Sequence, residues 1–183
     1  NWLFFRTFFL ANQASLRPFF GMLPWLFLFL APAITMRSWA EEKKLGTIEM
    51  LMTLPVRDYE VVLGKFLSAF AFLALNLALT LPLVLTVTLL GDPDPGPIWG
   101  GYAGACLLGG TCLAIGLFAS GITENQIVAF IIAIVIGFAF LFGRPGVTLL
   151  FLFISFAALR EFMTLTYTRS ADYLALTAGF FFV

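Results

Sequence analysis

MRSWAEEKKLGTIEMLMTLPVRDYEVVLGK, residues 36–65, is a charged stretch that lies between two long apolar runs. It holds five of the ten lysine and arginine residues of the chain and five of its ten acidic residues. The flanking runs, Phe19–Met36 and Phe66–Leu90, carry no charged residue. A charged segment between two uncharged runs is typical of an aqueous connector in a membrane protein. This connector is longer than a simple turn requires, so we expect a partner to dock there.

The composition of the whole chain excludes a water-soluble protein. Of its 183 residues, 61% are hydrophobic and 11% are charged, whereas soluble domains carry about 25% charged residues. A soluble fold of this size could not remove so much apolar surface from water. The apolar runs are continuous rather than alternating, which indicates spanning helices and not a β-barrel. We therefore predict an all-α integral membrane protein.

The charged and reactive residues exclude several other classes of function. The net charge is zero and no basic tract occurs, so we expect no nucleic-acid partner. Cys106 and Cys112 lie in one apolar run, and we interpret them as small buried hydrophobic residues rather than metal ligands or a disulfide. The chain has no histidine, and no acidic residue lies within the predicted spans over residues 19–36, 66–90, 98–119 and 127–142. We therefore expect no enzyme activity, no metal and no cofactor on this chain.

Uncharged runs of about 20 residues mark the predicted membrane spans. These spans cover residues 19–36, 66–90, 98–119 and 127–142, and residues 172–183 are predicted to start a last span. Residues 1–18 are aromatic and weakly charged, which is typical of an external or interfacial segment. Residues 143–171 contain an apolar run that is short for a crossing, so we predict an external re-entrant or interfacial region. Residues 1–183 then form a single transmembrane domain, which we expect to be part of a longer protein.

The distribution of basic residues gives the predicted orientation. The positive-inside rule places residues 37–65 in the cytoplasm, and alternation then puts residues 91–97 outside and residues 120–126 inside. Both sides of the membrane receive five lysine and arginine residues in this arrangement. We still place residues 37–65 inside, because their basic residues are concentrated close to two spans, whereas the external ones are scattered singly.

Residues 37–65 carry the pattern of two short helices followed by a return to the membrane. An amphipathic helical pattern over residues 39–52 is broken at Gly46. Thr47 is a weak candidate to cap the second helix, because a capping box would have an acid in place of Met50. Pro55 ends this helix. Asp58 is predicted to cap the helix that continues into the next span.

The run AEEKKLGTIEMLMTLPVRDYEVVLGKF, residues 40–66, resembles the intracellular signature of type-2 ABC exporter permeases. It is most similar to the gliding-motility-associated branch, where a pattern EE+..GT.E.L.TLPV.D.E.VLGKF follows the second span. The proline-rich turn GDPDPGP, residues 91–97, resembles an external turn of the family. The run LAIGLFASGITENQIVAF, residues 113–130, resembles the segment that contains its second cytoplasmic loop. The resemblance thus extends over most of the chain.

The resemblance implies a six-span helical bundle, of which this chain lacks the first span and has an incomplete last span. It implies a permease dimer in a bacterial inner membrane, with ATP and magnesium bound by a separate cytoplasmic ATPase; no P-loop motif occurs here. We call residues 37–65 the coupling region. The residues implied to couple to the ATPase are Glu42, Lys43, Lys44, Leu45, Gly46, Thr47, Glu49, Met50 and Leu54. The second cytoplasmic loop is implied at Thr123, Glu124, Asn125 and Gln126.

Several alternatives remain open at the level of sequence. Asn76 can line a translocation path or hydrogen-bond a neighbouring helix, and the second role is more common. Gly104 and Gly109 are candidate helix contacts, since small residues let membrane helices approach closely. The alternative to an exporter permease is a non-transporting scaffold or assembly subunit of a larger envelope complex. Membrane lipid and an extracytoplasmic accessory protein are further expected partners.

Overall fold

The computed structural model describes residues 16–53, 55–91 and 93–165, and the regular structure in these ranges is entirely helical. The helices are α2 (Arg17–Thr35), α3 (Arg37–Leu45), α4 (Thr47–Met52), α5 (Asp58–Ala78), α6 (Leu81–Leu90), α7 (Pro95–Ile122), α8 (Gln126–Leu141) and α9 (Arg144–Leu165). Three helical stretches are long and apolar enough to cross a membrane, namely Arg17–Leu45, Asp58–Leu90 and Pro95–Ile122. The prediction of an all-helical membrane protein is confirmed, and the truncated six-span bundle stays a prediction.

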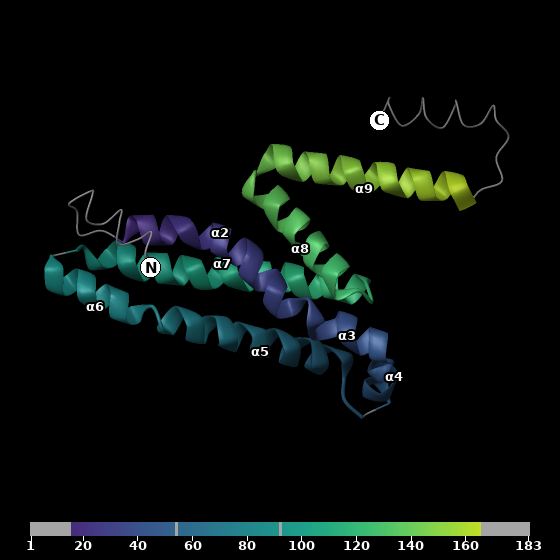
Figure 1. The fold of residues 1–183 in the computed structure, drawn as a ribbon, viewed down its shortest axis with the longest axis horizontal. Helices are drawn as coiled ribbons and strands as arrows, with labels where there is room; N and C mark the ends of the chain where they lie inside the picture. The colour runs from purple at the N-terminus through teal and green to yellow at the C-terminus, as the bar shows by residue number, and fades with distance from the viewer. Residues whose placement is uncertain (1–15, 54, 92, 166–183) are drawn as a thin grey trace. The chain divides into compact units, whose positions relative to one another are not determined.

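The chain divides into two compact units, residues 1–138 and residues 139–183. In the first unit, α7 packs against both α2 and α5, and α3 lies beside the end of α7 (Figure 1). The core between these helices is formed by Leu23, Phe27, Ala31, Ala69, Leu73, Leu77, Ala105 and Leu113. A smaller cluster forms where α6 meets the start of α7 and consists of Leu16, Leu83, Val87 and Ile98. The unit is therefore built around α7.

The predicted span over residues 66–90 is interrupted in the structure. Helix α5 ends at Ala78 and α6 begins at Leu81, because Pro82 has no backbone N–H and its ring clashes with the carbonyl four residues earlier. The Thr80 hydroxyl donates to the Leu77 carbonyl at 2.6 Å and lies 2.9 Å from the Tyr102 hydroxyl of α7. The break is thus fixed to the neighbouring helix.

The coupling region has the predicted order of helix, break, helix and return. Helix α3 ends at Gly46, which adopts a left-handed conformation with φ of 72°, and α4 follows directly. Thr47 is not the cap that the sequence suggested: it is the first residue of α4, and its hydroxyl donates back to the Glu42 carbonyl at 3.3 Å. The turn is made by Gly46 because glycine adopts positive φ without strain.

The start of α5 also differs from the prediction. Arg57, in an extended conformation, is the N-cap residue, and Asp58 is the first helical residue. The Glu60 carboxylate accepts a hydrogen bond from the Arg57 backbone N–H at 3.3 Å. Asp58 and Glu60 both lie in the first turn, where negative charge is favourable at the positive end of the helix dipole. The acids of this segment therefore stabilise the helix start without either being the N-cap residue.

The second unit contains α9, which runs without interruption over Arg144–Leu165. The sequence predicts a re-entrant or interfacial region over residues 143–171. The apolar part of this helix, Arg144–Ala158, is shorter than the three stretches that are long enough to cross a membrane, and the re-entrant or interfacial region stays a prediction. The predicted segments 1–18 and 172–183 lie outside the described residues, apart from residues 16–18 of the first.

Candidate functional site

The turn between α3 and α4 presents apolar side chains to solvent. Leu45 is 68% exposed and Met50 is 74% exposed. Among the predicted coupling residues, Lys44, Gly46, Thr47 and Glu49 are also exposed, whereas Glu42 and Lys43 are half-buried. We call residues 44–50 the tip of the coupling region. Exposed apolar side chains next to charged ones are typical of a protein-binding surface. Leu54 lies outside the described residues.

The base of the coupling region is held by Ser120, near the C-terminal end of α7. Its hydroxyl oxygen accepts hydrogen bonds from the backbone N–H groups of Trp39 at 3.0 Å and Ala40 at 3.1 Å. The same hydroxyl lies 3.0 Å from the Met36 carbonyl oxygen, to which it donates. Ser120 is fully buried. One small side chain of α7 therefore bonds three backbone groups at the start of α3.

A second contact joins α3 to the end of α7, just before the predicted second cytoplasmic loop. The Lys43 ammonium group donates to the backbone carbonyl of Gly121, two residues before the loop begins at Thr123. The Asn125 side chain then accepts from the Ile127 N–H at 2.9 Å and so satisfies an amide at the start of α8. The structure therefore brings the coupling region and the end of α7 together at one end of the first unit. Glu124 and Asn125 are exposed, and Thr123 and Gln126 are half-buried.

A third contact fixes α3 to α5. The Lys65 ammonium lies 2.5 Å from a carboxylate oxygen of Glu42 and donates to the Ser38 carbonyl. It also lies 4.3 Å from the ring centroid of Trp39, which is within cation–π range. The side chains of Lys65 and Glu42 are 18% and 34% exposed. The second Glu42 oxygen is buried without a hydrogen-bond partner, so this carboxylate depends on Lys65 for its charge compensation.

The glycines of α7 divide into two groups. Gly109 is buried against α5, and a Cβ there would lie 2.7 Å from the Leu73 side chain. Nothing lies within 4 Å of a Cβ built on Gly104, so within the described chain this residue faces open space. Gly101 and Gly116, which the sequence analysis did not single out, pack against Phe20 and Thr35 of α2. Their regular spacing with Gly109, at seven or eight residues, places the three on one side of α7.

Asn76 bonds its own helix. Its side-chain amide donates to the Phe72 carbonyl at 2.8 Å, four residues earlier in α5. This bond satisfies part of the amide within a span, as polar side chains in membrane helices require. The recorded bond belongs neither to a translocation path nor to a helix–helix contact, so both roles of Asn76 stay predictions.

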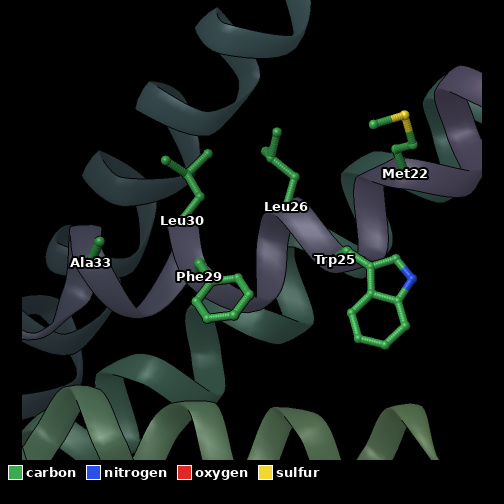
Figure 2. Close-up of a pocket in the computed structure, with 6 residues that line it drawn as sticks. All are labelled: Met22, Trp25, Leu26, Phe29, Leu30 and Ala33. Atoms are coloured by element: carbon green, nitrogen blue, oxygen red, sulfur yellow. The ribbon is translucent and has the colours of Figure 1, made fainter. Parts of the chain in front are cut away.

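Apolar hollows lie on the described part of the first unit. An open hollow of about 740 Å³ follows α2, and its lining within the described residues comes from that helix (Figure 2): Met22, Trp25, Leu26, Phe29, Leu30 and Ala33. A second hollow of about 530 Å³ lies beside the Ser120 contact, between α3, α5 and α7, and its lining includes Trp39, Phe66 and Phe118. Apolar walls of this kind suit lipid tails or another membrane helix.

The described part of the chain contains side chains that can ligate a metal ion, two cysteines among them. Among residues 16–53, 55–91 and 93–165, no group of three or more histidine, cysteine, aspartate or glutamate residues is placed to hold a metal ion. Cys106 and Cys112 are free thiols in α7 and are half-buried.

These features define an integral membrane protein whose long apolar helices carry a polar, partly exposed helical connector at one end. The chain belongs to the ABC-2 transporter family: the model of that family, described as ABC-2 family transporter protein, matches residues 7–178. It is a membrane component of such a transporter, and permeases of this family generally pair with an ATPase subunit. No curated protein and no solved structure matches the chain.

Ser120 is the residue of this site that sequence reasoning missed. It lies inside the run SGITENQ, which the resemblance assigns to a loop, but the structure makes it a buried residue of α7. Its neighbours Ala119 and Gly121 are small. A lone serine between small residues at the end of an apolar span is the available signal, since such a sequence permits close approach of another backbone.

Proposed function

We propose that this chain is the permease subunit of an ATP-driven exporter, in which the coupling region docks on a separate cytoplasmic ATPase. One observation carries the proposal. The tip of the coupling region is exposed and partly apolar, and α3, which leads to it, is hydrogen-bonded to the long apolar helices α5 and α7. Leu45 and Met50 are exposed, while α3 is bonded to α7 through Ser120 and to α5 through Lys65. A docking element transmits force only when its attachment is stiff, because a flexible linker absorbs displacement.

The wider arrangement is part of the same proposal. Residues 37–65 and 120–126 face the cytoplasm, residues 91–97 face outside, and the chain supplies most of a six-span subunit in a bacterial inner membrane. The Lys43–Gly121 contact supports the common side of the first two segments. Two permease copies form the translocation path, ATP and magnesium bind the ATPase, and an extracytoplasmic accessory protein completes the complex. Within the family we assign the chain to the gliding-motility-associated branch, on the pattern in residues 40–66.

The alternative is a scaffold that assembles an envelope complex without moving cargo. Such a protein has no need of a stiff connection between a docking surface and its spanning helices. The hydrogen bonds from Ser120 and Lys65 to α3 therefore favour a permease. A scaffold would also bind its partner without changing the rate of ATP hydrolysis, and this difference separates the two functions experimentally.

The test is co-purification of the full-length chain with its partner ABC ATPase, followed by ATPase assays in liposomes. Glu49→Arg, at the exposed tip, is expected to weaken association or uncouple hydrolysis, since an unpaired charge at an interface costs about 2–5 kcal/mol. Asp92→Arg, in the proposed external turn, should do neither. Parental association and stimulation in Glu49→Arg would show that the coupling region is only an orientation signal.

A matched pair tests the apolar part of the tip. Leu45 and Leu89 are exposed to similar extents, 68% and 76%, and Leu89 lies near the end of α6. Leu45→Ser is expected to weaken ATPase binding at least tenfold, because apolar anchors at the centre of an interface contribute about 2 kcal/mol or more. Leu89→Ser should leave binding unchanged. Equal binding by the two variants would contradict a docking role for the tip.

A further inference from the structure

We infer that Ser120 is a positioning residue, which joins the start of the coupling region to α7 so that a displacement of α3 moves α7 as well. This inference rests on the proposed function, because it names the residue through which the docking force passes. It follows from the three backbone groups that the Ser120 hydroxyl bonds, all of them 80 or more residues away in sequence.

The joint lies where α2 passes into α3, at Met36, which keeps a right-handed helical conformation with φ of −56° and ψ of −30°. Helix α2 ends at Thr35 and α3 begins at Arg37. The first amides of any helix lack a partner in their own helix, and here the N-cap residue, Met36, provides no side-chain hydrogen bond. Ser120 accepts from one of these amides, that of Trp39, and from the amide of the next residue, Ala40. It therefore acts as the N-terminal cap of α3, supplied by a different helix.

Close packing surrounds this cap. Ser120 and Ala40 are fully buried, which means that the α3 backbone lies directly against α7. Gly116 precedes Ser120 by one helical turn and packs against the Thr35 hydroxyl at the end of α2. Residues four apart lie on one face of a helix. The face of α7 that carries Gly116 and Ser120 therefore contacts both the end of α2 and the start of α3.

The serine bonds are the stiffest of the contacts that hold α3. Lys43 and Lys65 reach their partners through four-carbon side chains, which lose much rotamer freedom when they are held in place. A serine hydroxyl oxygen is one bond from Cβ and moves relative to its backbone through a single side-chain torsion. A shift of the α3 amides is therefore passed to the α7 backbone through Ser120, whereas the lysine side chains can bend to follow it.

The experiment uses the full-length chain in nanodiscs, with Ser120→Ala as the test variant. Ser68→Ala is the matched control, because the Ser68 hydroxyl is exposed and donates to the Lys65 carbonyl of its own helix, at 2.8 Å. Hydrogen exchange of the Trp39 and Ala40 amides is measured first. Binding of the partner ABC ATPase, and the stimulation of its hydrolysis rate by the chain, are then measured on the same preparations.

In Ser120→Ala, we expect exchange at Trp39 and Ala40 to become at least tenfold faster, since alanine offers no acceptor. We expect ATPase binding to stay within twofold of the parent, because the tip is untouched, and ATPase stimulation to fall at least fivefold. Ser68→Ala should match the parent in all three measurements. If Ser120→Ala does not accumulate in the membrane, Ser120→Cys, with its weaker sulfur acceptor, is expected to change in the same direction.

Each contrary outcome has a distinct meaning. Unchanged exchange at Trp39 and Ala40 would overturn the capping role of Ser120. Faster exchange with parental stimulation would overturn the positioning role and leave only a structural cap. Failure of the parent chain to bind the ATPase would contradict the proposed function, and the coupling part of this inference with it, while the exchange measurement would still decide whether Ser120 caps α3.

Discussion

Gly116 of α7 lies against Thr35 of α2 so closely that a Cβ at position 116 would overlap the threonine hydroxyl. Thr35 is fully buried, and its hydroxyl donates to the Ala31 carbonyl at 2.9 Å. The hydroxyl therefore cannot turn away without leaving a buried polar group unpaired, which is costly. Glycine at position 116 is required by this contact rather than by backbone conformation.

The first prediction compares three glycines of α7. Gly116→Ala and Gly109→Ala are each expected to destabilise the chain by about 1–3 kcal/mol, because the added methyl group overpacks the contacts with Thr35 and Leu73. Gly104→Ala should be neutral or stabilising by up to about 1 kcal/mol, since nothing lies near its Cβ and alanine is the better helix former. The measurement is SDS-induced unfolding in mixed micelles.

The same series tests a role for Gly104 in the proposed dimer. Gly104→Leu should leave the unfolding of the single chain unchanged, because the site is open within the described residues. It should weaken self-association if a second copy packs there, whereas Leu107→Ile should not. Unchanged association of Gly104→Leu would remove Gly104 from the interface, and equal stability of all three alanine variants would contradict the packing at Gly109 and Gly116.

Local signals in the sequence were sufficient to predict the order of elements in the coupling region. The break at Gly46 and the end of α4 before Pro55 follow from residue types whose backbone preferences are nearly independent of context. The interruption near Pro82 was missed because membrane helices often accommodate proline, as α2 does at Pro24 and Pro32. Nothing in the local sequence distinguishes the prolines that are accommodated from the one that breaks a helix.

The contacts of the site could not be predicted from the sequence, for a different reason. Ser120 and Trp39 are separated by 81 positions, and their pairing depends on how α7 packs against α2 and α3. Glycine content alone likewise suggested a packing face on α7 but not which glycines form it. Only the packing shows that Gly109 is buried and Gly104 faces open space, since each glycine is equally small.

The second prediction concerns orientation. Lys44→Cys at the tip and Asp94→Cys in the turn before α7 should react with membrane-impermeant maleimide from opposite sides of the membrane. The reason is that one long apolar stretch, Asp58–Leu90, separates them. Labelling is measured in intact cells and in inverted vesicles of the full-length chain. Labelling of both cysteines from one side would contradict the proposed orientation and the role of residues 37–65 in the cytoplasm.

The third prediction concerns Lys65. Lys65→Met is expected to destabilise the first unit by about 2–4 kcal/mol, because it leaves the half-buried Glu42 carboxylate without its 2.5 Å partner. Glu42→Gln should rescue most of that loss in the double variant, since an uncharged amide needs no counter-charge. Lys44→Met, at an exposed lysine, should change stability by less than about 0.5 kcal/mol.

The check on this prediction is a double-mutant cycle by SDS-induced unfolding. An additive result, with no rescue by Glu42→Gln, would mean that Lys65 acts through the Trp39 ring and the Ser38 carbonyl rather than through the carboxylate. A loss no larger than that of Lys44→Met would contradict the importance of the whole contact.

The fourth prediction concerns Gly46, whose positive φ of 72° turns α3 into α4. A Cβ at this position would meet nothing within 4 Å, so any cost of substitution comes from the backbone alone. For residues other than glycine, the left-handed conformation costs about 1–2 kcal/mol, and asparagine tolerates it best. ATPase stimulation should therefore fall in the order Gly46→Asn, Gly46→Ala, Gly46→Val, with β-branched valine the most impaired.

Gly64→Ala is the control for this series, because Gly64 also has open space around its Cβ but has no positive φ. It should keep parental stimulation and stability. None of the substitutions alters the tip residues Leu45, Glu49 or Met50. A change in ATPase stimulation in this series therefore reports the orientation of α4 and not a loss of contacts made by these side chains. Equal stimulation by the asparagine, alanine and valine variants would mean that the docking surface does not depend on the turn at Gly46. The tip would then adapt its conformation when it binds the ATPase. The angle between α3 and α4 would not matter for the transmission of force to α3.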